Sequence, residues 1–184
     1  MENPPLFIRP SFRAGAACLL ALMAQPLSAA QVREHGRVWL NGSITETPCA
    51  IDTRSRDQSV NMGATPTAAI ARDGHGPSRR FSIRLVNCSL TRSAGALPDW
   101  RYFRTTFDGH GADSRFDLAG DARGVALELA DARGNIARPG VPLPPGQLVE
   151  GDQRLDYTLR LVSSSGALKA GDLRATLKFR MDYY

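Results

Sequence analysis

Two cysteines in the body of the chain carry its clearest chemistry, because a thiol pair can form a disulfide or help to bind a metal. Cys49 and Cys88 delimit a loop of 40 residues, and the third cysteine, Cys18, lies in an apolar N-terminal stretch. The apolar N-terminal stretch indicates export, and an even number of cysteines in an exported chain favours a disulfide, which would stabilise the fold by about 4 kcal/mol. Metal binding and free thiols are the rival interpretations, but no histidine lies near either cysteine. We predict a Cys49–Cys88 disulfide.

Catalytic and metal-binding patterns are missing from the rest of the sequence. The histidines lie far apart, without the spacing of a zinc-binding helix: His35, His75 and His110. Three aspartates lie close together, but nothing pairs them with a polarised pocket: Asp108, Asp113 and Asp117. No nucleophile elbow, P-loop or dinucleotide-binding glycine pattern follows a predicted strand. We expect no enzyme, no metal, no cofactor and no small-molecule substrate.

Three aromatic residues at 100–103 could bind a sugar by stacking, as lectin sites do: Trp100, Tyr102 and Phe103. The alternative is that they pack in a strand and in the core. We therefore keep a sugar-binding adhesin as the less favoured function.

The first 30 residues have the features of a signal peptide. Arg9 and Arg13 supply positive charge ahead of an apolar run of ten residues at 14–23, and Ser28-Ala29-Ala30 offers small residues for cleavage before Gln31. A run of that length is too short for a permanent membrane span, which needs about 20 residues. A buried N-terminal helix is the alternative. We expect residues 1–30 to be removed on export to the periplasm.

The remaining 154 residues have the size of one domain with a proper core. Without Glu2, Arg9 and Arg13, the 23 basic and 18 acidic residues become 21 and 17, a net charge of +4. The basic residues are scattered, with Arg79-Arg80 the densest pair, whereas a nucleic-acid interface needs a patch or stripe. We expect no nucleic-acid partner.

Apolar residues alternate with polar ones in several short runs, which predicts strands with one face towards a core. These runs lie at residues 38–41, 81–86, 125–130 and 157–161, and turn signals such as Asp73-Gly74, Gly134-Asn135 and Pro144-Pro145-Gly146 separate them. One helical turn is possible near Thr67–Ala71. Short strands with frequent turns predict an all-β sandwich.

The C-terminal run is the longest, and we expect it to form one unbroken strand about 35 Å long. Its inward apolar positions are Leu173, Ala175, Leu177, Phe179, Met181 and Tyr183. Because the chain ends there, the strand has no hairpin partner and could leave an open sheet edge for another chain. Closure of an ordinary sandwich by Tyr183 is the equal alternative from periodicity alone.

The sequence resembles the type 1 and P-type fimbrial subunits of the chaperone–usher pathway. Gly42 precedes Cys49 by seven residues, Gly171 is fourteenth from the C-terminus and Tyr183 is penultimate. Further shared blocks are Pro48–Asp52, Val60–Gly63, Phe81–Leu85 and Asn87-Cys88. The resemblance covers essentially all of residues 31–184.

This resemblance implies an incomplete immunoglobulin-like β-sandwich that lacks its seventh strand. A groove beside the C-terminal strand would be filled first by a periplasmic chaperone and then by the N-terminal extension of a neighbouring pilin, at an outer-membrane usher. The implied groove residues are the six inward positions above and Tyr184, whose C-terminal carboxylate the chaperone would bind. Residues 31–40 would be the chain's own donor-strand extension, with Gly36, Val38 and Leu40 on one face, followed by a pilin domain at 41–184.

Within the family, the chain is most similar to the terminator and anchor subunit of the P pilus. The blocks that carry this similarity are Gly76–Phe81, Thr106–Gly109, Arg133–Arg138, Leu155–Arg160 and Phe179–Tyr183. The resemblance implies a structural subunit at the filament base, in a fimbrium exposed at the cell surface. A shaft or adaptor subunit is the alternative role.

Overall fold

A computed structural model describes residues 36–43, 45–93, 95 and 97–184, so the predicted signal peptide lies outside the described residues. The chain divides into two units, Met1–Ser43 and Ile44–Tyr184, and each is described by itself. In the first unit, residues 36–43 form no helix or strand, and Val38, Trp39 and Leu40 are exposed. The strand expected at 38–41 is therefore absent, since an extended segment needs a partner for its backbone hydrogen bonds.

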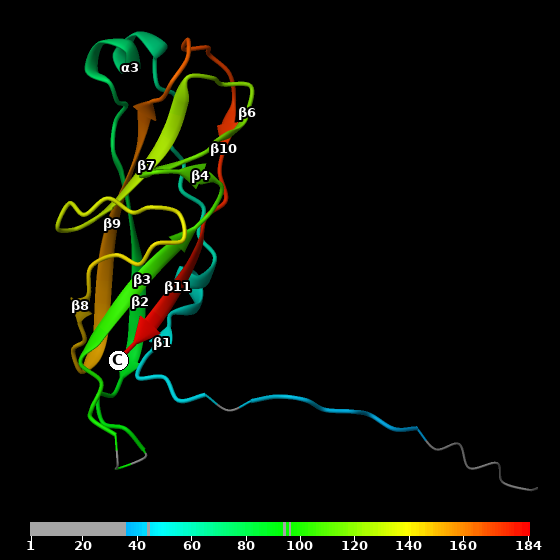
Figure 1. Cartoon of the computed structure of the whole chain (residues 1–184), viewed down its shortest axis with the longest axis vertical. Coiled ribbons are helices and arrows are strands. Elements are labelled where there is room, and N and C mark those ends of the chain that lie inside the picture. The colour runs from blue at the N-terminus through cyan, green and yellow to red at the C-terminus, as the bar shows by residue number, and fades with distance from the viewer. Residues whose placement is uncertain (1–35, 44, 94, 96) are drawn as a thin grey trace, which may run out of the picture. The chain divides into compact units, whose positions relative to one another are not determined.

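The second unit is built on a six-stranded antiparallel sheet with the strand order β1-β2-β9-β7-β5-β4 (Figure 1). Three long strands form its centre, as the alternating runs predict: β2 (Arg79–Cys88), β7 (Val125–Asp131) and β9 (Gly151–Ser163). The shorter strands at its edges are β1 (Ala50–Ile51), β4 (Gly111–Ala112) and β5 (Arg115–Phe116).

Two smaller sheets complete the all-β fold. The three-stranded sheet has the order β11-β3-β8, with β3 (Tyr102–Asp108), β8 (Gly146–Gln147) and β11 (Lys178–Tyr183). The two-stranded sheet pairs β6 (Ala119–Gly120) with β10 (Leu173–Arg174). The core contains side chains from both the large sheet and the three-stranded sheet: Ile83, Leu85, Phe107, Phe116, Leu129 and Leu159.

Two short helices interrupt the strands. Helix α2 (Thr53–Arg56) begins at Asp52, whose side chain accepts a hydrogen bond from the Arg54 N–H. Helix α3 (Thr67–Asp73) includes the turn expected near Thr67–Ala71 and buries Ile70. It ends at Gly74, whose left-handed backbone and N–H bond to the Ile70 carbonyl form a C-cap.

A polar chain crosses the core between the sheets. The Tyr157 hydroxyl donates to Thr105 Oγ1 at 2.9 Å, and the Thr105 hydroxyl donates to Met181 Sδ at 3.2 Å. Burial raises the pKa of Tyr157 to about 12, the hydrogen bond to Thr105 opposes this shift and the negative charge of Asp131 adds to it. These two hydrogen bonds thus join β9 to β3 and β11, and they satisfy the buried hydroxyl groups of Tyr157 and Thr105.

The C-terminal run does not form the single unbroken strand that its alternation predicts. Strand β10 pairs with β6, the chain passes residues 175–177 without a strand, and β11 pairs with β3. The physical reason is that the two halves join different sheets, so the backbone must leave one ladder before it enters the next. Leu173, Leu177, Phe179, Met181 and Tyr183 are nevertheless half-buried, whereas Ala175 is exposed.

Candidate functional site

A groove of about 1110 Å³ lies in the described part of the chain. Its floor is apolar and comes from the core face of the large sheet, from β3 and from the segment after β5: Phe81, Phe107, Leu118, Val125, Leu127, Leu159 and Leu161. One side, here called the first wall, is residues 55–68, and the other side, the second wall, is residues 169–177 with Phe179. The groove therefore exposes core-type surface along two facing segments.

The first wall is extended between the two helices but belongs to no sheet. Val60 and Met62 are half-buried against the core, whereas Ser59 and Asn61 are exposed. Within the described residues, the backbone of residues 58–65 makes no hydrogen bond to another backbone group. This wall thus has the alternation of a strand, and its backbone is open to pairing apart from the Gly63 N–H, which donates to Asn61 Oδ1 at 2.8 Å.

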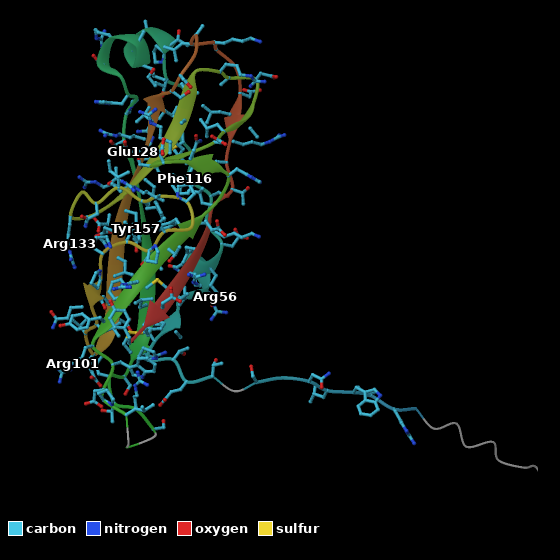
Figure 2. All side chains as sticks on the ribbon, viewed as in Figure 1. Arg56, Arg101, Phe116, Glu128, Arg133 and Tyr157 are labelled. Carbon is cyan, nitrogen blue, oxygen red and sulfur yellow. A yellow bond between two sulfur atoms is a disulfide. The ribbon has the colours of Figure 1, made fainter. Side chains whose placement is uncertain are left out.

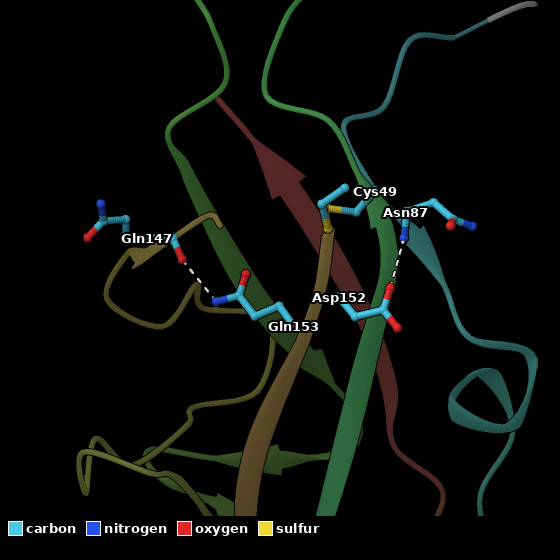
Figure 3. Close-up of a disulfide and its surroundings, with 6 residues drawn as sticks. Cys49, Asn87, Gln147, Asp152 and Gln153 are labelled. Atoms are coloured by element: carbon cyan, nitrogen blue, oxygen red, sulfur yellow. Dashed lines mark hydrogen bonds between the residues drawn. A yellow bond between two sulfur atoms is a disulfide. The ribbon is translucent and has the colours of Figure 1, made fainter. Parts of the chain in front are cut away.

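The start of the first wall is fastened to the large sheet. The Cys49–Cys88 disulfide is present and lies where β1 meets β2 (Figure 3), which confirms the predicted pairing. The Asp52 N–H donates to the Arg84 carbonyl at 2.9 Å, and the Arg84 N–H donates to Ser55 Oγ at 3.0 Å. Arg56 follows on the outside of this attachment (Figure 2).

A bulge in β2 brings Cys88 into register for this disulfide. The pairing with β9 shifts between Leu85 and Cys88, and Asn87 has a positive φ of 53°. The displaced Asn87 N–H donates to Asp152 Oδ1 at 3.3 Å (Figure 3). The amide that the bulge displaces is therefore hydrogen-bonded to a side chain.

The second wall is held by a clasp, residues 119–124, at its N-terminal end. The N–H groups of Asp121 and Ala122 both donate to the Asp172 carbonyl, at 2.9 and 3.1 Å. A Cβ on Gly171 would lie 2.6 Å from the Ala122 nitrogen, so only glycine permits this approach. The clasp fixes one end of the wall, and β3 fixes the other through its ladder with β11.

Strand β11 is an edge strand in the described part of the chain, because β3 is its sole ladder partner there. An edge strand beside an apolar groove offers both backbone hydrogen bonds and side-chain pockets. The arrangement can therefore accept an extended segment that lies between the two walls and places alternate apolar side chains on the floor.

The predicted groove residues divide into two groups. Leu173, Ala175, Leu177 and Phe179 line the groove, whereas Met181, Tyr183 and Tyr184 lie beyond it. One oxygen of the Tyr184 C-terminal carboxylate accepts hydrogen bonds from the Arg101 and Tyr102 N–H groups, at 3.1 and 3.0 Å. That pairing extends the β11–β3 ladder to Tyr184.

Tyr183 belongs to an aromatic cluster below the groove. Its ring meets Trp100 edge-on at 6.4 Å, and the Arg92 guanidinium lies 3.4 Å from the Trp100 ring centroid. Burial raises the pKa of Tyr183, and its hydroxyl has no hydrogen-bond partner among the described residues.

The aromatic residues considered for sugar stacking do not form a joint surface. Trp100 and Phe103 are buried in the core, and Tyr102 is exposed beside Tyr184. Core packing is thus the outcome for two of the three. In the described residues no three metal-ligating side chains gather, and no helix is long and apolar enough to cross a membrane.

Sequence reasoning missed the first wall as a structural element. The signal was the alternation of Val60 and Met62, which is too short to stand out without the opposite wall.

Comparison with a family of known sequences gives a match over residues 38–184, to the family described as fimbrial protein. Two Escherichia coli relatives, the PRS and PAP fimbrial minor pilin proteins, are each 39% identical over 150 residues, which cover 80% of this chain and 77% of theirs. The E. coli Pap fimbrial major pilin protein is 27% identical over 156 residues, covering 81% of this chain and 84% of its own.

Solved structures show the same similarity. The P pilus rod subunit PapA superposes with a TM-score of 0.66 and 25% identity, covering 75% of this chain and all of its own. A subunit in the structure of a chaperone–usher pilus superposes with a TM-score of 0.67 and 27% identity, covering 83% and 97%.

Proposed function

The chain belongs to the fimbrial protein family, and we propose that it is the minor pilin that terminates and anchors a chaperone–usher pilus at its base. Its relatives and structural neighbours are structural pilins, so it is a pilin subunit of a chaperone–usher fimbria and not an enzyme. Pilins of this kind contact neighbouring subunits. The finer assignments below are proposals.

The observation that carries the proposal is the groove between the first wall, whose backbone at residues 58–65 is unpaired in the described part of the chain, and the second wall, where β10 and β11 each have a ladder partner on one side alone. A strand placed there would complete the sandwich, since it could pair with the backbone of residues 58–65 on one side and with the second wall on the other. Without such a strand, the apolar floor invites aggregation. The groove residues Leu173, Ala175, Leu177 and Phe179 would contact the donor strand directly.

The first donor would be a strand of a periplasmic chaperone, after export directed by residues 1–30. Met181, Tyr183 and Tyr184 lie along the continuation of the same edge. The chaperone strand would run along this continuation and bind the C-terminal carboxylate of Tyr184. An outer-membrane usher would then receive the complex.

The chain would in turn donate residues 31–40 to the groove of a neighbouring subunit. Val38 and Leu40 are 94% exposed, and Gly36 lies two residues before Val38 on the same face of an extended segment. Exposed alternate apolar residues of this kind suit a strand that becomes buried in another subunit.

The relatives support a minor-pilin role, and the basal position is the finer part of the proposal. Identity is 39% to two minor pilins and 27% to a major pilin from the same organism, which favours a minor over a shaft subunit. A terminator must accept the chaperone strand yet resist exchange with an incoming extension. A shaft or adaptor subunit, the second candidate, would undergo that exchange.

Strand displacement tests the choice between these roles. The purified complex of the chain with its chaperone is mixed with peptides that correspond to the N-terminal extensions of the other subunits of the same pilus. We expect the chaperone to stay bound while a shaft subunit of that pilus, the matched control, releases it. Displacement from both subunits at equal rates would refute the terminator role and leave the subunit role intact.

A further inference from the structure

A second hollow, of about 560 Å³, lies on the opposite side of the large sheet from the groove. It is lined by outward-facing residues of β2, β7 and β9 and by the hairpin that follows β7. Leu155, Tyr157 and Leu159 of β9 point into the core, so the intervening residues of β9 face this hollow. The donor-strand groove does not use this face.

The floor of the hollow is a single row of residues that are in register across the strands. Thr158 of β9 pairs with Arg80 of β2 on one side and with Ala130 of β7 on the other, and Ala130 pairs with Ile136 of the hairpin. Directly opposed residues of an antiparallel sheet point to the same face. The row therefore has a cation at one end, small side chains in the middle and an exposed isoleucine at the other end.

Two ion pairs flank this row, and neither of them includes Arg80. Arg160 Nε lies 2.6 Å from Glu128 Oε1, and Arg154 lies 3.0 Å from Asp156. Figure 2 labels Glu128 and the hairpin residue Arg133.

The remaining acid of the hollow, Asp131, is also engaged. Its carboxylate accepts hydrogen bonds from the N–H groups of Arg133 and Asn135 and from the Asn135 side-chain amide. Among the described residues, Arg80 is thus the one lining arginine without an ion pair or a side-chain hydrogen bond.

We propose that this hollow is a lateral binding site for another subunit of the filament, separate from strand donation. The partner would present a carboxylate to Arg80 and an apolar side chain to Ala130 and Ile136. The row spans three strand spacings, or about 14 Å, which an extended segment of about five residues covers. The charge left over on Arg80 selects an acidic segment, and the exposed Ile136 selects one with an apolar neighbour.

Site-specific crosslinking tests the site in cells that assemble the complete pilus. A benzophenone amino acid replaces Thr158 at the centre of the row, and adducts are identified by mass spectrometry after irradiation. We expect an adduct with another filament subunit, at a peptide that contains an acidic residue beside an apolar one. No adduct, or adducts solely with the chaperone, the usher or proteins outside the filament, would overturn the proposal.

Charge reversal supplies the matched comparison. Arg80→Glu should weaken the adduct by about fivefold or more, whereas Arg84→Glu should leave it unchanged. Arg84 lies on the same face of β2 but outside the hollow, and it pairs with Asp152 at 3.5 Å. If Arg80→Glu lowers the amount of folded subunit, Arg80→Gln removes the charge at similar length and must also weaken the adduct. Equal adducts in all variants would refute the role of Arg80, whether or not the subunit terminates the filament.

Discussion

Removal of the disulfide should destabilise the second unit by about 4 kcal/mol. Cys49 and Cys88 are 39 positions apart, and closing a loop of that length lowers the entropy of the unfolded chain by about 13 cal/mol/K in the chain-entropy model. Both cysteines are buried, so their replacement by alanine changes the polar surface exposed to solvent very little. Because domains are stable by about 5–15 kcal/mol, such a loss removes a large part of the total.

Urea unfolding of the purified full chain measures this loss. Trp39 and Trp100 are the two tryptophans of the chain, so a Trp39→Phe background leaves the buried Trp100 as the fluorescence reporter. Cys49→Ala, Cys88→Ala and the double variant should show the same loss, because each breaks the same bond. The original chain under reducing conditions is the matched control and should unfold like the variants.

The reasoning would be refuted if the double variant lost less than about 1 kcal/mol with an unchanged denaturant slope. That result would mean that the two ladder pairs of β1 with β2 and the hydrogen bond from the Arg84 N–H to the Ser55 side chain already hold the first wall.

Three further predictions address the core, the clasp and the second wall. Between pH 10 and 12, Tyr157 loses its proton in the unfolded chain but keeps it in the folded chain, so the free energy of unfolding should fall by about 2–3 kcal/mol over this window. The fall should be smaller in Tyr157→Phe. Equal pH profiles of the two proteins by calorimetry would contradict this. Gly171→Ala should lower the free energy of unfolding by about 1–3 kcal/mol in the same urea titration, because the added Cβ would collide with the clasp. Gly95→Ala is the control and should have little effect, because a Cβ added there would have no atom within 4 Å. Leu177→Asp would place an unpaired charge in the groove and should abolish co-purification with the chaperone. Lys178→Asp, at an exposed position, is the control and should co-purify normally. Normal co-purification of Leu177→Asp would count against the groove.

The sequence predicted those parts of the fold that local alternation of apolar and polar residues determines. Alternation identified β2, β7 and β9 and their inward faces, since a half-buried strand must alternate. Strand β3 was harder to identify because Thr105, Thr106 and Phe107 are buried in succession. Residues 140–143 run beside β3, with the Gly140 N–H donating to the Phe107 carbonyl and the Leu143 N–H to the Thr105 carbonyl, and that contact is invisible to local periodicity.

The C-terminal run shows the limit of periodicity in another way. Alternation indicates which side chains face inward, and Leu173, Leu177 and Phe179 do so. Alternation carries no information on which strand each half pairs with. The change of pairing partner at residues 175–177, from β6 to β3, could therefore not be foreseen. The groove depends on the same kind of information, because its two walls are more than 100 residues apart in the sequence.

Amide hydrogen exchange tests the central claim, that a strand is missing between the two walls. Exchange is measured by mass spectrometry on the full chain alone and in complex with its chaperone. The account predicts that residues 58–65 and 173–179 gain protection together in the complex, while β7 and β9 change little, because the donor strand pairs with both walls. Protection confined to one wall, or equal exchange in both walls with and without the chaperone, would contradict the account.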